Sequence, residues 1–258
     1  MSTRTVTATL ALLLVSAAGV SAQDFNWRGR VDRGRSIEIT GINGDIHAVA
    51  ASGAEVRVSA EKSARRSDPD DVRIEVLEHG GNVTICAIYP ERDGRNTNEC
   101  RPGGATNRNI GNNDVRVDFT VEVPAGVTLI AESVNGNVEA SRLESDIEAN
   151  TVNGQIDLGT TGSAEANTVN GSITAEIGRA DWSGELTFET VNGGIELTLP
   201  DNLNADVHAS TVNGGISTDF PLTVQGRFGP KRLNGRIGDG GRTLSLTTVN
   251  GEIELRRR

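Results

Sequence analysis

Acidic side chains beside predicted turns are the residues of this chain best suited to catalysis or metal binding. The 258-residue sequence carries 35 Asp and Glu residues, and several of them recur near turns: Asp45, Asp157, Glu196, Asp219 and Glu252. Paired carboxylates could act as general acid and base on a glycan, and a cluster could bind calcium. Their offsets from the nearest Asn-Gly pair vary, so we expect solvated charges on an outer face rather than one column.

The histidines and cysteines predict structure rather than catalysis. His47, His79 and His208 stand in separate strand or turn contexts, whereas a metal centre or a Ser-His-Asp triad needs convergence. We predict no catalytic residue, no metal ligand and no cofactor. Cys86 and Cys100 belong to no Cys-x-x-Cys pair, and in an oxidising compartment they are expected to form a disulfide that ties strand 82–89 to the polar loop 91–109.

One short motif recurs through the second half of the chain. The strands and turns that it forms must therefore position the acidic side chains. Its form is Thr-Val-Asn-Gly-x-Ile, with a hydroxyl residue usually first and Val or Ile last in every copy. The predicted corners are Asn43-Gly44 in an early copy, then Asn135-Gly136, Asn153-Gly154, Asn170-Gly171, Asn192-Gly193, Asn213-Gly214, Asn234-Gly235 and Asn250-Gly251. Self-similarity at intervals of about 20 residues predicts a stacked repeat.

Two all-β architectures fit this motif locally. Asn-Gly between alternating strands is a hairpin signal, which would give a meander in which Val249 faces outward. In a β-solenoid the same pair would form a corner, both Thr248 and Val249 would face inward, and the asparagines would stack in a ladder. In either case Asn and Gly would supply left-handed backbone. We favour the solenoid, because a hairpin meander would expose seven apolar residues that a solenoid could bury in one stacked column.

The N-terminal residues predict export. Arg4, the apolar run from Leu10 to Val15 and Val20-Ser21-Ala22 have the form of a cleaved signal peptide over residues 1–22. We expect an N-terminal β region over 23–123 with the disulfide-tied loop, continuous with a repeat β-solenoid over 124–258. No second apolar segment predicts a transmembrane span, so the mature protein is expected to be periplasmic or extracellular.

Composition limits the possible partners. The formal net charge is −10, which disfavours nucleic acid and anionic lipid, and the C-terminal Arg256-Arg257-Arg258 is expected to be a solvated tail. Trp182 lies in an irregular insertion and is a possible contact for a sugar or protein, or packs against the solenoid edge. An uncovered last rung at Glu252 to Leu255 would allow end-to-end self-association.

The signal peptide, the early Gly41-Ile42-Asn43-Gly44-Asp45-Ile46, the strand from Val115 to Pro124 and the repeated motif together resemble the bacterial putative-adhesin domains of unknown function. The resemblance implies an exported or envelope-associated β-solenoid, and it supplies no catalytic residues. We therefore expect a non-enzymatic adhesin-like or envelope scaffold protein that contacts an envelope protein or glycan. The alternatives are a carbohydrate-active β-helix using surface carboxylates and an envelope-stress sensor or scaffold.

Overall fold

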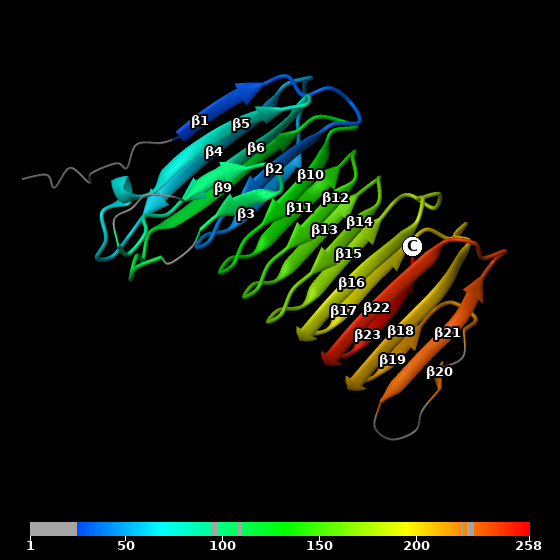
Figure 1. Ribbon diagram of the computed structural model, residues 1–258. Helices are drawn as coiled ribbons and strands as arrows, with labels where there is room; N and C mark the ends of the chain where they lie inside the picture. Colours follow the sequence, from blue (N-terminus) through cyan, green and yellow to red (C-terminus); the bar gives the residue numbers. More distant parts are fainter. Residues whose placement is uncertain (1–24, 94–97, 108–109, 223, 226–229) are drawn as a thin grey trace, which may run out of the picture.

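The computed structural model is an all-β molecule in which two long sheets pack face to face (Figure 1). It describes residues 25–93, 98–107, 110–222, 224–225 and 230–258, so the predicted signal peptide lies outside the described residues. Within these ranges the one helical element is the 3-10 turn η1 (Pro69–Asp71). No helix in the described part of the chain is long and apolar enough to cross a membrane.

The first sheet, sheet A, contains ten strands among the described residues. In spatial order they are β1 (Phe25–Gly29), β4 (Val56–Ser63), β9 (Arg116–Val123), β3 (Ile46–Ala50), β11 (Val138–Leu143), β13 (Ile156–Thr160), β15 (Ile173–Ile177), β17 (Ile195–Leu199), β23 (Ile253–Arg257) and β19 (Ile216–Thr218). Strand β4 is antiparallel to both neighbours, and all other neighbours in this sheet are parallel.

The second sheet, sheet B, contains eleven strands within the same ranges. Their spatial order is β20 (Val224–Gln225), β21 (Lys231–Ile237), β18 (Ala205–Asn213), β22 (Thr243–Asn250), β16 (Glu185–Asn192), β14 (Ala164–Asn167), β12 (Ile147–Asn150), β10 (Thr128–Glu132), β2 (Ser36–Thr40), β6 (Asn82–Ile88) and β5 (Arg73–His79). A separate hairpin pairs β7 (Glu99–Arg101) with β8 (Gly104–Thr106).

The prediction of a β-solenoid is confirmed. Each repeat runs along one strand of sheet B, turns at its Asn-Gly corner and continues as a strand of sheet A, as β10 does into β11 and β12 into β13. The hairpin meander is wrong, because the two strands that flank a corner lie in opposite sheets and pair with the next coil instead of with each other. The early copy, β2 and β3, belongs to the same stack as the later repeats.

Stacked apolar side chains between the sheets explain the low aromatic content. The isoleucine or valine two residues after the corner glycine is buried at six corners and half-buried at the seventh, Ile216. The six buried residues form one column: Ile46, Val138, Ile156, Ile173, Ile195 and Ile253. Sheet B contributes many alanines opposite, including Ala131, Ala149 and Ala166. Small side chains on one sheet against branched ones on the other fill a thin core without aromatic rings.

The C-terminal coil is not at the end of the stack. Strand β22 lies between β16 and β18, and β23 lies between β17 and β19. In Figure 1 this red coil is inserted into the yellow and gold part of the molecule. Glu252 to Leu255 is therefore not a terminal rung and offers no uncovered edge for end-to-end self-association. The strand at that edge of sheet A is β19, while β21 and β20 continue sheet B beyond β18.

One predicted corner is also wrong. Asn234 and Gly235 lie within β21, which pairs antiparallel with β18, so that Asn234 is opposite His208. In this copy Arg232 replaces the usual threonine, and an arginine cannot take the buried position that the hydroxyl residue has in the other repeats. The corners in the structure are the seven Asn-Gly pairs that begin at residues 43, 135, 153, 170, 192, 213 and 250.

Candidate functional site

The first residue of the motif joins successive coils by a buried hydroxyl. In each repeat after the first, the hydroxyl donates to the corner glycine carbonyl of the adjacent coil at 2.8 to 3.1 Å. The pairs are Ser133 to Gly44, Thr151 to Gly136, Thr168 to Gly154, Thr190 to Gly171, Thr248 to Gly193 and Thr211 to Gly251. These six hydroxyl residues are 1% to 6% exposed. A buried polar group needs such a partner, which explains the threonine at this position.

Replacing Thr190 by valine tests this bond. The change keeps the shape of the side chain but removes the donor to the Gly171 carbonyl, 2.8 Å away. We expect a loss of about 1 kcal/mol in the free energy of unfolding, which corresponds to about 2–4 °C in melting temperature. Thr190→Ser keeps the hydroxyl and is the matched control. Equal melting temperatures for the valine variant and the wild type would contradict the role of the hydroxyl.

The corner glycines are required by the close approach of adjacent coils. A Cβ on Gly136, Gly154, Gly171, Gly193, Gly214 or Gly251 would lie 1.7 to 1.9 Å from the glycine carbonyl oxygen of a neighbouring coil. Among the seven corners only Gly44 has a positive φ, of 129°. The expectation that these glycines supply left-handed backbone is thus wrong for six of them, and the absent side chain is what matters.

The asparagines of the seven corners form a hydrogen-bonded ladder, which we call the Asn ladder. Each side-chain amide nitrogen donates to the side-chain oxygen of the next asparagine at 2.8 to 2.9 Å, in the spatial order Asn213, Asn250, Asn192, Asn170, Asn153, Asn135 and Asn43. All six amides donate in the same direction along the stack. The ladder fixes the register of the corners, as stacked amides do in cross-β structures.

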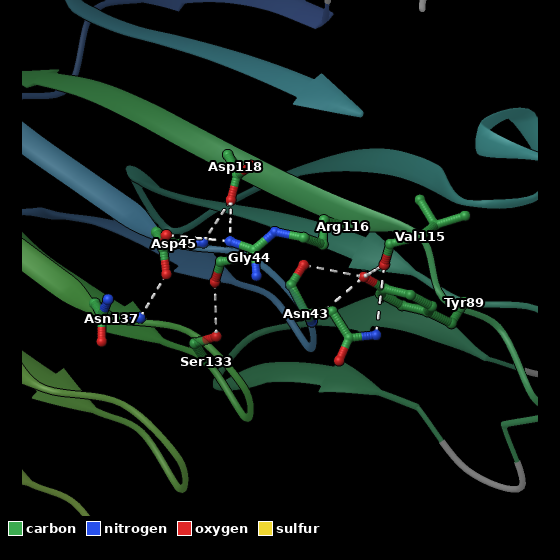
Figure 2. Close-up of polar contacts among 9 residues, drawn as sticks. All are labelled: Asn43, Gly44, Asp45, Tyr89, Val115, Arg116, Asp118, Ser133 and Asn137. Atoms are coloured by element: carbon green, nitrogen blue, oxygen red, sulfur yellow. Dashed lines mark hydrogen bonds and ion pairs between the residues drawn. The ribbon is translucent and has the colours of Figure 1, made fainter. Parts of the chain in front are cut away.

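The N-terminal end of the Asn ladder is capped by a group of polar contacts that the motif does not encode (Figure 2). Asn43 Nδ2 is 3.4 Å from the Val115 carbonyl, which also accepts a 2.9 Å bond from the Tyr89 hydroxyl. Burial raises the pKa of Tyr89 to about 12, so the phenol stays a donor. Arg116 lies between Asp45 and Asp118 and pairs with both.

The valines of the motif lie outside the core, contrary to expectation. Six of them, one on each of six coils, are 36% to 43% exposed, in the spatial order Val134, Val152, Val169, Val191, Val249 and Val212. We call this set the Val column. Every other large apolar side chain in the described residues is less exposed, apart from Val76 at 37%. The prediction of a solenoid was therefore correct, but the argument that it buries the valines was wrong. The valines form an exposed row instead of a buried one.

The outer face of sheet A is rich in charge, and several of its carboxylates have cationic partners. Arg256 pairs with Glu196 and Glu254 at 2.8 and 3.0 Å, and Arg258 pairs with Glu176 at 3.2 Å. His47 lies 3.4 Å from Glu139. The sequence predicted a solvated tail for the C-terminal arginines. In the structure they are part of this face instead. Arg257 also stacks over the Phe220 ring at 5.0 Å.

An open hollow of about 400 Å³ lies on this face above Gly159. Its lining includes Glu139, Asp157, Glu176 and Glu196, which come from four adjacent strands. A bulge between Ala140 and Leu143 in β11 adjoins it, and Arg142 within that bulge has a φ of 55°. A carbohydrate-active protein would need carboxylates in a groove, and this hollow is where sheet A gathers them.

The outer face of sheet B carries glutamates that form no ion pair with any described residue. They are Glu38, Glu132, Glu148, Glu165, Glu185 and Glu189, and we call them the acidic face. Burial, together with the charges of Glu38 and Glu148, raises the pKa of Glu132. Burial, with Glu148 and Glu185, raises the pKa of Glu165. Like charges on adjacent strands thus remain uncompensated on this side of the molecule.

Cys86 and Cys100 form the disulfide, with their Cα atoms 5.6 Å apart. Cys86 lies on β6 and Cys100 on β7, so the bond fastens the β7–β8 hairpin to sheet B. Two contacts extend this attachment: the Cys100 amide donates to Glu75 at 3.2 Å, and the Gly103 amide donates to Glu38 at 3.1 Å. The hairpin buries Glu38, which is 5% exposed.

Reduction of the disulfide tests how local this attachment is. In the chain-entropy model a bond that closes a loop of this length contributes about 3 kcal/mol. Because the coils are joined by their own hydrogen bonds, we expect reduction to increase amide exchange mainly between residues 93 and 113. The amides of β12 to β17 should remain protected, as in the oxidised protein. Global loss of protection on reduction would contradict a local role for the bond.

Trp182 and the histidines have structural partners. Trp182 is 4% exposed, and its Nε1 donates to the Thr243 carbonyl at 3.3 Å, so it does not serve as an exposed contact residue. His79 Nε2 is 2.9 Å from Thr84 Oγ1, and His208 Nδ1 is 2.9 Å from Asn234 Oδ1. The sequence interpretation missed Tyr89 and the acidic face. Alternation of glutamate with apolar residues in 147–150 and 164–167 was the available signal for the latter.

Comparison with known proteins gives a family match and distant structural similarity. The model of the family described as Toastrack DUF4097 matches residues 126–256. No curated protein gives a significant match to the chain.

Two solved structures are among those that match the chain. A putative cell adhesion protein from Clostridium sporogenes is 8% identical, with a TM-score of 0.48, and the alignment covers 92% of this chain and 99% of that chain. A putative adhesin from Bacteroides fragilis is 14% identical, with a TM-score of 0.37, and the alignment covers 91% of this chain and 98% of that chain. At such identities and TM-scores the names of these proteins carry no argument about this one.

Proposed function

This chain belongs to the Toastrack DUF4097 family, and on that premise we propose that it is an exported, non-enzymatic, adhesin-like protein that works by surface contact. The observation that supports this proposal is the Val column. Isolated exposed apolar residues are ordinary on a protein surface, whereas a contiguous apolar row marks an interaction site. Here the row follows the corner edge of the solenoid beside the Asn ladder.

The buried part of the motif makes this row regular. The threonine hydroxyls, the corner glycines and the Asn ladder each join one coil to the next, so successive valines repeat at the strand spacing of about 4.8 Å. A rigid row of this kind loses little conformational entropy on binding. It therefore suits contact with an extended partner, such as an envelope protein or a glycan chain.

The disulfide supports an exported location, because such bonds persist in oxidising compartments. Together with the predicted signal peptide over residues 1–22, it favours the periplasm or the cell surface. A role as an envelope-stress sensor or scaffold would use the same contact surface. The carbohydrate-active alternative would instead use the hollow above Gly159.

The experiment compares binding of the protein from Gln23 to Arg258 to envelope extract and to a glycan array. We expect the triple variant Val152→Asn, Val169→Asn, Val191→Asn to bind about tenfold more weakly, because each buried valine contributes on the order of 1 kcal/mol or more. The control triple, Thr174→Asn, Thr187→Asn, Ser245→Asn, changes outward residues of the flat faces and should bind normally. Saturable glycan turnover that Asp157→Asn abolishes would contradict the proposal.

A further inference from the structure

The two outer faces of the solenoid differ in how their carboxylates are neutralised. On sheet A, arginine side chains pair with the glutamates of β15, β17 and β23, and His47 lies 3.4 Å from Glu139 of β11. On sheet B, none of the six glutamates of the acidic face has a cationic partner among the described residues. The ion pairs of sheet B, Arg73 with Glu75 and Arg236 with Asp206, lie toward its two ends, so the stretch between them keeps an uncompensated negative field.

The acidic face is organised by the strand register. Glu148 on β12 lies directly beside Glu165 on β14. Glu132 on β10 lies beside Thr40 on β2 and beside Asn150 on β12. Adjacent parallel strands are about 4.8 Å apart, so these carboxylates form a band that crosses three coils and reaches the edge of the β7–β8 hairpin.

A second observation, independent of charge, marks the hairpin end of this band. Thr40 is 8% exposed, and its Oγ1 is buried without a hydrogen-bond partner among the described residues. A buried hydroxyl without a partner is costly. The neighbouring Glu132 carboxylate likewise has neither an ion pair nor a hydrogen bond in the described part of the chain.

The absent side chain of Gly104 lets the hairpin lie close to both of these groups. A Cβ placed on Gly104 would lie 3.0 Å from Glu132 Oε2 and 3.6 Å from Thr40 Oγ1, so both oxygens face the same point beside the hairpin. The Glu38 carboxylate is close by, because it accepts hydrogen bonds from the Gly103 amide and from Thr84 Oγ1. The result is a set of acceptors with no donor directed at the hydroxyl of Thr40 or the carboxylate of Glu132.

We propose that the acidic face binds lysine side chains of a basic polypeptide partner, with one ammonium group held by Thr40 Oγ1 and the Glu132 carboxylate beside Gly104. An ammonium is a compact cation with three donors, which matches the two acceptors offered by one hydroxyl and one carboxylate. Glu148 and Glu165 then hold further lysines along the band. In the described residues no three carboxylate, imidazole or thiolate ligands are placed to hold a metal ion.

This surface is distinct from the Val column, so either proposal can fail without the other. Binding of the basic segment lowers the repulsion among the glutamates, which is the same repulsion that contributes to the raised pKa of Glu132 and of Glu165. The interaction is expected to weaken as salt is added, because the band is partly exposed.

The test measures binding of a fluorescent octalysine peptide to the full mature chain by anisotropy. The triple variant Glu132→Gln, Glu148→Gln, Glu165→Gln is expected to bind about tenfold more weakly. The control triple, Glu139→Gln, Asp157→Asn, Glu176→Gln, changes the net charge by the same amount on sheet A and is expected to stay within about twofold. An equal loss in both triples would mean a general charge effect and would overturn the proposal.

Thr40→Val distinguishes the binding of an ammonium at Thr40 Oγ1 from general electrostatic attraction to the acidic face. It removes one acceptor without a change of shape or charge, so we expect peptide affinity to fall about fivefold. Because the hydroxyl has no partner in the free protein, the melting temperature should stay the same or rise. Unchanged affinity in Thr40→Val would overturn the placement of an ammonium beside Gly104.

Discussion

Replacing Gly193 by valine is expected to lower the free energy of unfolding by about 3 kcal/mol or more, a fall of about 6–12 °C in melting temperature. A Cβ at this position would lie 1.9 Å from the Gly171 carbonyl oxygen and 2.4 Å from its carbon. Both are backbone atoms of the adjacent coil, so no side-chain rotation can relieve the overlap. The coils would have to move apart, and the Thr248 bond to the Gly193 carbonyl would be weakened as well.

The choice of variants distinguishes close approach from backbone conformation. Gly53→Val is the control for stability, since a Cβ there meets nothing within 4 Å, and it should change stability by about 0.5 kcal/mol at most. Gly193→Asn is the informative variant, because asparagine tolerates left-handed backbone but still carries a Cβ. We expect it to destabilise nearly as much as valine. A melting temperature close to that of the wild type for Gly193→Asn would contradict the close-approach explanation.

Deletion of residues 243–258 is expected to disrupt the C-terminal third of the molecule instead of shortening it by one coil. The deleted strands β22 and β23 pair on both sides, with β16 and β17 on one side and with β18 and β19 on the other. The stability of a stacked repeat is approximately the sum of its coils and their nearest-neighbour interfaces. This deletion removes two interfaces and leaves β18 without its parallel partner.

The readout is amide hydrogen exchange across residues 205–218 together with thermal unfolding. We expect these amides to lose protection in the deletion variant and the cooperative transition to broaden, while β10 to β15 stay protected. Deleting Arg258 alone removes an exposed ion pair with Glu176 and should cost about 1 kcal/mol or less. Full protection of residues 205–218 after the long deletion would contradict the inserted position of the last coil.

The architecture and the seven true corners could be predicted because their signal is local and repeated. Threonine, asparagine and glycine each have one structural task in every coil, so the motif recurs wherever that task recurs. The outward direction of the valines follows simple alternation, because β22 continues through Val249 to Asn250 with Thr248 buried and Val249 exposed. The expected change of direction between Thr248 and Val249 was wrong. The hairpin and solenoid alternatives differed on this point, and the structure combines solenoid stacking with the outward valine of the hairpin.

The spatial order of the coils was harder to predict, because it depends on pairing between strands that are distant in the sequence. Nothing near Asn250 indicates that its coil is inserted between those of Asn192 and Asn213. The wrong corner at Asn234 did carry a signal, since Arg232 and Leu233 replace the usual Thr and Val. The site at Thr40 and Glu132 was beyond prediction for a similar reason. It exists only where the disulfide-tied hairpin lies over sheet B.

The measurement that tests the central claim most directly is site-specific photo-crosslinking in the cell envelope. A photoreactive amino acid is placed at Val169 in the Val column, and in a second protein at Thr174 on the flat face of sheet A. If the protein works by contact along its corner edge, the probe at position 169 should give a discrete crosslinked product and the probe at position 174 should not. Crosslinks from position 174 alone would contradict the claim.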